Sequence, residues 1–436
     1  MNYNLEKLGV TVLNQMQEEM LHTYKENKQV VLLSPTGSGK TLAYLLPLLS
    51  EINVQSNELQ ALVIVPSREL AIQTNSVFKS LATGARAYAC YGGRPAMDEH
   101  RTMRSLSPHL IVGTPGRILD HLQKRNFLSS SISTLVIDEF DKCLELGFRQ
   151  QMADIVGLLD YVQRRVLLSA TDNPDIPNFL ASSPFVRVDH LDRSSEGQNR
   201  IRFNVVASPQ KDKLETLLRL LCERGQQKTL VFVNYRESVQ RVADYLAKSG
   251  VFADAFHGGM EQRDREKALY RFSNGSCNVL VSTDLASRGL DISDVDNVVH
   301  YHLPPTEDSF VHRNGRTARW MSEGTSWLIL GPEEYMPPFV SVQFTSHQLS
   351  ATVTKPLPPM WVTLYIGKGK KDKVNKIDVV GFLTKVGALA REEIGRVDVL
   401  PNWAFAAVSR KAAPMLLKRV KGQKIKGKKT IIELAE

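Results

Sequence analysis

The stretch Gln29–Thr41, QVVLLSPTGSGKT, decides the fold of the first part of the chain. The apolar run after Gln29 predicts a strand that is buried on both faces, and the apolar run after Lys40 predicts a helix. Between them, small residues let backbone N–H groups surround phosphate oxygens, and the helix N-terminus favours negative charge there. The sequence therefore predicts a nucleotide site, in which Lys40 binds the β- and γ-phosphates and Thr41 binds Mg²⁺. The predicted site consists of Ser34, Pro35, Thr36, Gly37, Ser38, Gly39, Lys40 and Thr41.

A second strand ends abruptly in acids. Thr134–Asp141, TLVIDEFD, places three carboxylates in four residues after an apolar run. Burying these groups is costly unless a cation or hydrogen bonds satisfy them. We therefore predict that Asp138 holds Mg²⁺ through water and that Glu139 orients or deprotonates an attacking water. A glycine-rich turn or an acidic surface turn would explain either segment alone, but their joint presence favours a site for ATP and Mg²⁺.

Strands of the same character recur through the first 335 residues, separated by polar stretches with helical spacing. This alternation predicts parallel sheets that are covered by helices on both sides. The polar segment Asp192–Asn199 is predicted to be an interdomain linker. The expected divisions are 1–191, 200–335, a linker at 336–359, and 360–436. The predicted strands are Gln29–Leu33, Ala61–Val65, Leu110–Val112, Thr134–Ile137, Arg165–Leu168, Thr229–Val233, Asn278–Val281, Asn297–Tyr301 and Thr325–Leu330.

The last part of the chain follows another pattern. The predicted elements are a strand at Trp361–Ile366, a helix at Ile377–Val386, strands at Ile394–Val399 and Ala404–Ser409, a helix at Lys411–Val420 and a strand at Thr430–Leu434. This βαββαβ order is the ferredoxin-like arrangement of many RNA-recognition domains. Trp403 and Phe405 lie at alternate positions and share a face. That face either stacks on bases or is covered by other parts of the protein.

Positive charge is concentrated in this tail. The chain has 55 Lys and Arg against 46 Asp and Glu, but Trp361–Glu436 holds 17 against 7. The rest of the chain is therefore nearly neutral, with 38 against 39. A compact basic segment is a candidate binder of a phosphate backbone. The alternative is a solvated, lysine-rich end that aids solubility.

Composition argues against several classes of protein. No apolar run approaches the ~18 residues of a membrane span, and Met1–Val10 has no apolar signal-peptide core, so we expect a cytoplasmic protein with no membrane partner. The cysteines lack paired spacing, which argues against a zinc site or a disulfide framework. They are Cys90, Cys143, Cys222 and Cys277. A monomer is the favoured state.

Asp138–Asp141 resembles the acidic motif of the DEAD-box RNA helicases, and further segments resemble that family's motifs in the family's order. They are Pro66–Leu70, Gly92–Gly93, Thr114–Arg117, Ser169–Thr171, Val231–Asn234, His257–Gln262, Ser282–Asp291 and His312–Arg319. The resemblance implies an α/β fold of two RecA-like parallel-sheet domains in tandem, with ATP between them. The tail adds a small α+β domain of the ferredoxin-like or RRM-like kind.

The resemblance also implies roles for individual residues. The implied catalytic residues are Lys40, Asp138, Glu139, Arg316 and Arg319. The two arginines act as arginine fingers, Asp291 contacts the ribose of ATP, and the amide of Gln17 reads adenine. Residues implied to couple the ATP state to RNA binding are Asp141, Ser169, Thr171 and His312. RNA-binding residues of the core are Arg68, Gly93, Thr114, Arg117, Arg265 and Thr283.

Three positions depart from the family pattern. Phe140 replaces alanine, and we expect it to alter the packing beneath Ser169–Thr171. Ser287 also replaces alanine, which is a small change. Only sixteen residues precede Gln17, so the aromatic residue that stacks on adenine is missing or is replaced by Tyr3.

In the tail, Leu364–Lys373 and Gly422–Lys429 resemble the RNA-binding domain of DbpA-type helicases. The implied RNA-binding lysines are Lys368, Lys370, Lys371, Lys424, Lys426, Lys428 and Lys429, and Lys373 belongs to the same basic loop. The resemblance implies a structured site in large-subunit ribosomal RNA as the target, and a role in ribosome assembly. The expected activity is ATP-dependent unwinding or remodelling of RNA. An ATP-gated RNA clamp or chaperone would use the same motifs and is the alternative.

Overall fold

The computed structural model divides into two compact units, Met1–Arg200 with Ser287–Ser293, and Ile201–Ala286 with Asp294–Glu436. The residues that it describes are 5–35, 37–81, 84–93, 96–172, 176–181, 183–191, 201–284, 292, 295–317, 323–350 and 354–435. Among these residues, no helix has both the length and the apolar character that crossing a bilayer requires.

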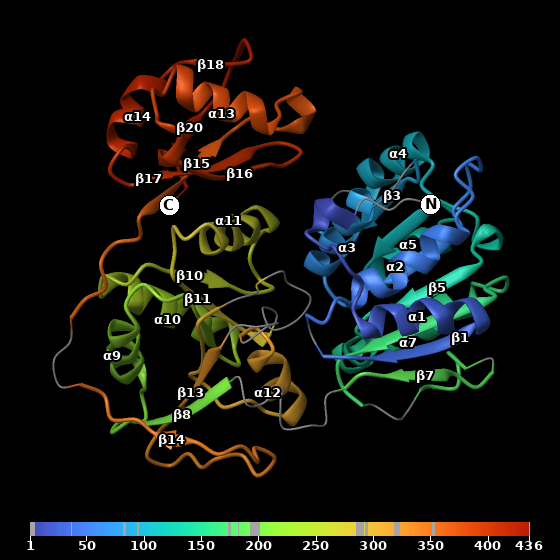
Figure 1. Cartoon of the computed structure of the whole chain (residues 1–436), viewed down its shortest axis with the longest axis horizontal. Coiled ribbons are helices and arrows are strands. Elements are labelled where there is room, and N and C mark those ends of the chain that lie inside the picture. The colour runs from blue at the N-terminus through green and yellow to red at the C-terminus, as the bar shows by residue number, and fades with distance from the viewer. Residues whose placement is uncertain are drawn as a thin grey trace. The chain divides into compact units, whose positions relative to one another are not determined.

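The first unit is built on a seven-stranded sheet with the order β3-β4-β2-β5-β6-β1-β7, and its strand pairs are parallel (Figure 1). The strands are β1 (Gln29–Leu33), β2 (Ala61–Ile64), β3 (Ala87–Cys90), β4 (Leu110–Gly113), β5 (Thr134–Ile137), β6 (Arg164–Ser169) and β7 (Val186–Asp189). The helices are α1 (Gln15–Glu26), α2 (Lys40–Glu51), α3 (Arg68–Leu81), α4 (Ala96–Leu106), α5 (Pro115–Gln123), α6 (Phe140–Cys143) and α7 (Arg149–Gly157). The five strands that were predicted in this unit are confirmed.

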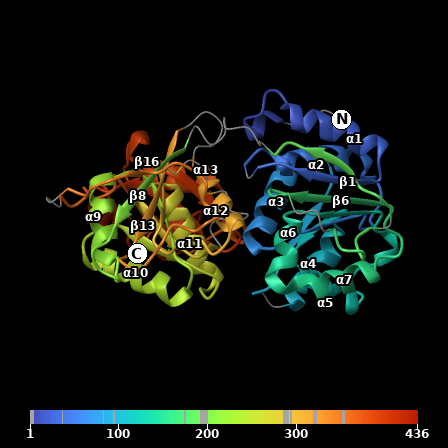
Figure 2. The same cartoon turned by 90° about the horizontal axis from the view of Figure 1, so that it is seen from below.

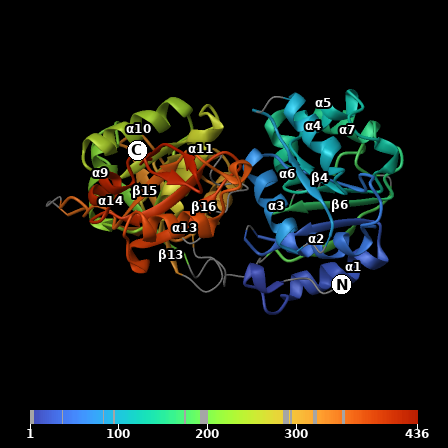
Figure 3. The same ribbon diagram turned by 90° about the horizontal axis from the view of Figure 1, so that it is seen from above.

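Both faces of this sheet are buried, as its continuous apolar strands predict. Val30 and Leu32 of β1 belong to one hydrophobic core, whereas Val31 and Leu33 belong to a second core. The alternation of side chains along a strand sends successive residues to opposite faces. Figures 2 and 3 show α1 and α2 on one side of the sheet and α5 and α7 on the other. The carboxyl ends of the strands therefore remain the open edge at which loops gather.

The second unit contains another seven-stranded sheet of parallel pairs, with the order β10-β11-β9-β12-β13-β8-β14. The strands are β8 (Ile201–Ala207), β9 (Thr229–Phe232), β10 (Ala253–Phe256), β11 (Val279–Ser282), β12 (Asn297–His300), β13 (Gly324–Leu330) and β14 (Thr345–Ser346). The helices are α9 (Leu214–Arg224), α10 (Arg236–Lys248), α11 (Gln262–Ser273) and α12 (Glu307–Asn314). The two sheets confirm the predicted tandem of RecA-like folds.

The segment 336–359, which was predicted to be a linker, is partly integrated into the second sheet. Its strand β14 pairs in parallel with β8 at the sheet edge. The ring of His347 lies 2.9 Å from a Glu223 carboxylate oxygen on α9, and Gln226 donates to the carbonyl of Leu357. The prediction of a linker is corrected for residues 345–347 and Leu357, because backbone pairing and side-chain hydrogen bonds attach them to β8, to α9 and to Gln226. The composition of the segment did not indicate these contacts.

The C-terminal domain, residues 360–435, has the predicted βαββαβ order. Its antiparallel sheet has the order β16-β17-β15-β20, and α13 and α14 pack on the face that contains Leu364, Ile366 and Ala406. The elements are β15 (Trp361–Ile366), α13 (Lys376–Lys385), β16 (Ile394–Val399), β17 (Ala404–Ser409), α14 (Ala413–Val420) and β20 (Ile432–Leu434). A hairpin of β18 (Lys424–Ile425) and β19 (Lys428–Lys429), which was not predicted, precedes β20.

Candidate functional site

The phosphate loop joins β1 to α2. Gly37 and Gly39 adopt φ values of +85° and +92°, a region that favours glycine. The Lys40 ammonium lies within the loop and donates to the carbonyls of Ser34 (2.6 Å) and Pro35 (2.9 Å). Phosphate oxygens are acceptors of the same kind, so a bound phosphate would take the place of these carbonyls. Thr36 lies outside the described residues.

Gln17 is held against this loop by a capping box at the start of α1. Its backbone N–H donates to Asn14 Oδ1 (2.9 Å), and its side-chain oxygen accepts from the Asn14 N–H (3.0 Å). The Gln17 amide donates to the Gly39 carbonyl (3.3 Å), and Asn14 donates to the Ser38 carbonyl (3.0 Å). A Cβ at Gly39 would lie 2.5 Å from Gln17 Nε2. The Asn-x-x-Gln spacing would have revealed Asn14, which the sequence analysis missed.

The acidic motif lies at the carboxyl end of β5, on the same edge of the sheet. Asp138 and Glu139 are both buried, and the Glu139 N–H donates to Asp138 Oδ1 (3.0 Å). Glu139 has a φ of +50°, so the chain turns sharply at the strand end. Burial and the nearby Glu139 carboxylate raise the pKa of Asp138 to about 7, while Lys40 opposes the shift. Two buried carboxylates close to an ammonium are a donor set that fits a divalent cation.

The acidic motif is connected to Ser169–Thr171 by a hydrogen bond from Thr171 Oγ1 to Asp141 Oδ2 (3.2 Å). Ser169 Oγ donates to the Thr171 carbonyl (2.8 Å), which fixes the end of β6. The predicted coupling residues of the first unit are therefore in contact. Phe140 is fully buried in the core beneath β5 and β6, which has room for its ring.

Four of the predicted RNA-binding residues lie at the carboxyl ends of the neighbouring strands β2, β3 and β4. The Arg68 guanidinium lies over Gly93, where a Cβ would approach Nη1 to 2.5 Å. The Thr114 N–H donates to the Cys90 carbonyl (3.1 Å), and Arg117 Nε lies 3.2 Å from a Glu99 carboxylate oxygen. This edge is where parallel sheets place their ligands.

In the second unit, Arg316 and His312 are buried, and Thr283 directly follows β11. Arg265 is also buried, with its guanidinium over the Phe256 ring (5.4 Å). The burial of Arg265 was not expected for a residue predicted to contact RNA, and its RNA contact stays a prediction. Asp291 and Arg319 lie outside the described residues.

Arg313, for which no role was predicted, connects several loops of the second unit. Its guanidinium bonds to Asp284 Oδ1 (2.5 Å), Asn234 Oδ1 (2.8 Å) and the His302 carbonyl (2.9 Å). It therefore joins three segments that the resemblance named separately. The positions of Asn234 and Asp284 at strand ends were the only available signal.

The comparisons with known proteins match the whole of this architecture. The DEAD/DEAH box helicase family model matches residues 14–179, the helicase conserved C-terminal domain matches 212–321, and the DbpA RNA binding domain matches 363–434. The chain is 35% identical over 448 residues to the ATP-dependent RNA helicase DbpA of Escherichia coli (strain K12), which covers 99% of this chain and 96% of the relative. The chain belongs to the DbpA-like DEAD-box ATP-dependent RNA helicases.

Other relatives agree with this assignment. The helicase is 29% identical to DbpA of Bacillus subtilis (strain 168) over 462 residues, covering 99% of this chain and 96% of that one. The structure of Mss116p bound to single-stranded RNA and AMP-PNP matches with a TM-score of 0.69 at 25% identity, covering 80% of this chain and 77% of that one. Saccharomyces cerevisiae Dbp5 bound to RNA and ADP BeF3 shares the fold with a TM-score of 0.67 at 22% identity, covering 79% and 92%.

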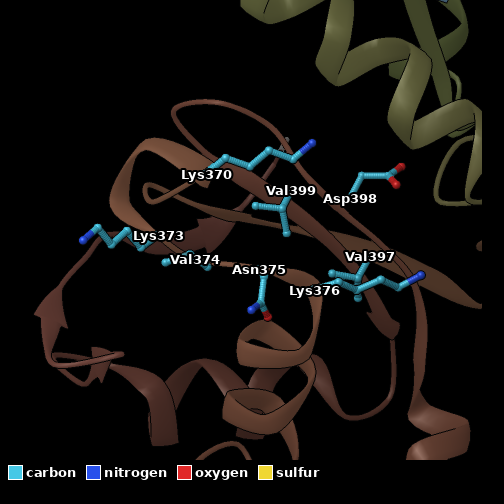
Figure 4. Close-up of a pocket in the computed structure, with 8 residues that line it drawn as sticks. All are labelled: Lys370, Lys373, Val374, Asn375, Lys376, Val397, Asp398 and Val399. Atoms are coloured by element: carbon cyan, nitrogen blue, oxygen red, sulfur yellow. The ribbon is translucent and has the colours of Figure 1, made fainter. Parts of the chain in front are cut away.

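The basic loops of the helicase's C-terminal domain lie together. The Asp372 carboxylate accepts from Lys368 Nζ (3.1 Å), and the Asp372 backbone carbonyl accepts from Lys428 Nζ (3.0 Å). Lys426 Nζ donates to the Asp378 carboxylate (3.0 Å). These contacts place the β18–β19 hairpin against α13 and the loop before it, so the two predicted lysine groups lie next to each other, and together they are called the basic surface. A hollow of about 570 Å³ lies beside it (Figure 4). Its lining residues are Lys370, Lys373, Val374, Asn375, Lys376, Val397, Asp398 and Val399.

The other face of this sheet is covered by α11 of the same unit. The Phe405 ring stacks on Tyr270 with centroids 5.0 Å apart, and Tyr270 donates to the carbonyls of Arg396 (2.5 Å) and Phe405 (3.1 Å). Arg271 donates to the Ala435 carbonyl (2.9 Å). Of the two interpretations of this face, the structure therefore favours coverage by protein at Phe405, because the stacking partner is Tyr270.

Proposed function

We propose that this helicase uses ATP and Mg²⁺ to part short segments of structured RNA, with large-subunit ribosomal RNA as its target during ribosome assembly in the cytoplasm. The observation that carries the proposal is the joint presence of the Lys40–Asp138–Glu139 arrangement and the single basic surface of the C-terminal domain. The arrangement of Lys40, Asp138 and Glu139 is suited to ATP hydrolysis. The basic surface is suited to binding the phosphate backbone of a folded RNA.

In this proposal, the residues of the first unit hold the nucleotide. Lys40 binds phosphate oxygens, Thr41 and Asp138 hold Mg²⁺, and Glu139 orients the attacking water. Mg²⁺, when bound, neutralises charge on the phosphate oxygens. The raised pKa of Asp138 supports this assignment, since a cation relieves the burial of two carboxylates.

The remaining roles follow the resemblance. We propose that Gln17 reads adenine, Asp291 contacts the ribose, and His312 couples ATP to RNA. Arg316 and Arg319 serve as arginine fingers when the two units close on ATP. The proposed RNA contacts of the core are Arg68, Gly93, Thr114, Arg117, Arg265 and Thr283. Such contacts to the backbone position RNA without reading its sequence.

Strand displacement distinguishes unwinding from clamping. With ATP, the wild-type chain is expected to separate a short duplex flanked by single-stranded RNA. Glu139→Gln is expected to lower turnover by at least about 100-fold, because an oriented base contributes that much to proton transfer. Asp154→Asn, which changes a partly exposed acid on α7, is the matched control and is expected to keep both activities. ATP-dependent retention or annealing of RNA without strand separation would favour the clamp.

The choice of target is tested by charge reversal in the basic surface. We expect Lys424→Glu with Lys429→Glu to weaken binding to a large-subunit ribosomal RNA fragment by about 10-fold or more and to reduce the salt dependence of binding. Lys385→Glu with Lys418→Glu makes the same charge change on the exposed helical side of the domain and serves as the control. Deleting residues 360–436 is less informative, because it also exposes Tyr270 of α11. Equal losses in both double variants would reject a specific basic surface.

A further inference from the structure

A buried carboxylate lies behind the Thr114–Arg117 loop. Glu99 of α4 is 1% exposed, and its carboxylate collects donors from the end of β3 and from α5. Oε1 accepts from the Tyr91 N–H (3.3 Å), while Oε2 lies 3.2 Å from Arg117 Nε and 3.3 Å from His121 Nε2. Burying a carboxylate is costly unless its charge and its lone pairs are met. The Arg117 guanidinium provides the positive charge that pairs with the buried Glu99 carboxylate.

The same cluster contains three side chains of the kinds that bind metals. The ligand atoms of Cys90, Glu99 and His121 all lie within 4.8 Å of one another. However, the Arg117 guanidinium supplies the positive charge beside Glu99 and would repel a cation. Burial raises the pKa of the Cys90 thiol well above its ordinary value, and Glu99 adds to the shift, so the thiol stays protonated. The cluster is therefore an ion-pair centre and not a metal site.

His121 connects Glu99 to the segment that follows α5. The Asn126 amide nitrogen lies 2.7 Å from His121 Nδ1. The other ring nitrogen, Nε2, lies 3.3 Å from a Glu99 carboxylate oxygen, so the ring lies between the Asn126 amide and Glu99. His121 and the Tyr91 N–H thus contact the Glu99 carboxylate together with Arg117, which brings a permanent positive charge to it.

We propose that Glu99 is a positioning residue for RNA, which holds Arg117 by Nε so that the distal guanidinium nitrogens face a backbone phosphate. This inference rests on the proposed RNA contact of Arg117. The guanidinium is planar and carries N–H donors on more than one edge, so a protein carboxylate can bind one edge while a phosphate binds another. Arg117 lies in the first turn of α5, and its side chain is 13% exposed, so it reaches the surface of the first unit. Holding the side chain in advance lowers the entropy lost on binding.

The test measures RNA-stimulated ATP hydrolysis by the full chain. Glu99→Gln is expected to raise the KM for RNA about 10-fold, because a neutral amide holds the Arg117 guanidinium less firmly than a carboxylate does, with kcat at saturating RNA near the wild-type value. Asp120→Asn is the matched control, because the Asp120 carboxylate lies 4.0 Å from Arg117 Nη1 but is one-third exposed. Its KM for RNA is expected to change less than about 2-fold.

A double variant separates this role from the RNA contact and from a general structural effect. If Glu99 acts through Arg117, Glu99→Gln adds nothing to the raised KM of Arg117→Ala. A wild-type KM in Arg117→Ala overturns the RNA contact itself. Two outcomes overturn only the positioning role. In the first, the KM for RNA is raised in Arg117→Ala but is that of the wild type in Glu99→Gln. In the second, the effects of the two substitutions add in the double variant. Should Glu99→Gln fail to fold, Arg117→Lys replaces it in the test. The compact lysine ammonium cannot bond to Glu99 and to a phosphate on two separate edges, as a guanidinium can. An unchanged KM for RNA in Arg117→Lys would count against the proposal.

Discussion

At the scale of the residue, Asp138 ties the stability of the first unit to pH. Burial, and then Glu139, raise the pKa of Asp138 to about 7, while an unfolded chain has an aspartate pKa of about 3.9. Between these values the folded protein binds a proton that the unfolded chain releases. Asp138 therefore lowers the free energy of unfolding as the pH rises from about 4 through 7.

We predict that Asp138→Asn stabilises the nucleotide-free protein at pH 8 and changes its stability little near pH 4. The gain at pH 8 is on the order of a few kcal/mol, at about 1.4 kcal/mol for each unit of pKa shift. Thermal unfolding of both proteins from pH 4 to 8 measures this difference. Asp120→Asn is the control, and its effect on stability has the opposite sign, because a hydrogen bond from Lys124 lowers the pKa of the partly exposed Asp120. A stability difference that does not depend on pH would refute the assignment.

At the scale of the element, α11 serves two neighbours, its own sheet and the C-terminal domain. Tyr270 stacks on Phe405, and Asn274, just after α11, donates to Thr363 Oγ1 (2.9 Å). Thr363 in turn donates to Ser276 Oγ (3.0 Å), so the side chains of Asn274, Thr363 and Ser276 form one chain of hydrogen bonds. The face of the C-terminal sheet around Phe405 is thus used for attachment to the second unit's α11.

We predict that Phe405→Ala loosens this attachment. Removing a buried phenyl ring typically costs about 3–5 kcal/mol, and the loss is expected in the unfolding of the C-terminal domain. Tyr270→Phe, which removes only the hydroxyl, should cost about 1 kcal/mol. Thermal unfolding with limited proteolysis measures both, and Ile431→Ala, at an exposed apolar position of the same domain, is the control. Equal stability of Phe405→Ala and Ile431→Ala would disprove the attachment.

At the scale of the whole molecule, local patterns were enough to predict most of the strands that the structure describes. β1, β5, β15, β16 and β17 begin and end where the apolar runs predict. A strand that is apolar on both faces, or a strand-loop-helix turn with small residues, is a local property of the chain. The phosphate loop, the acidic motif and the basic tail were predictable for the same reason, because each occupies one continuous segment.

The sequence by itself determined the class of the protein, its elements and its chemically active segments. Only the tertiary structure decided which of these segments touch. Glu99 had no signal in the sequence, and its role depends on β3, α4 and α5 coming together around Arg117. The coverage of Phe405 by Tyr270 joins residues 135 positions apart. Such contacts arise from packing between distant segments, so the spacing of residues along the chain does not encode them in a readable form.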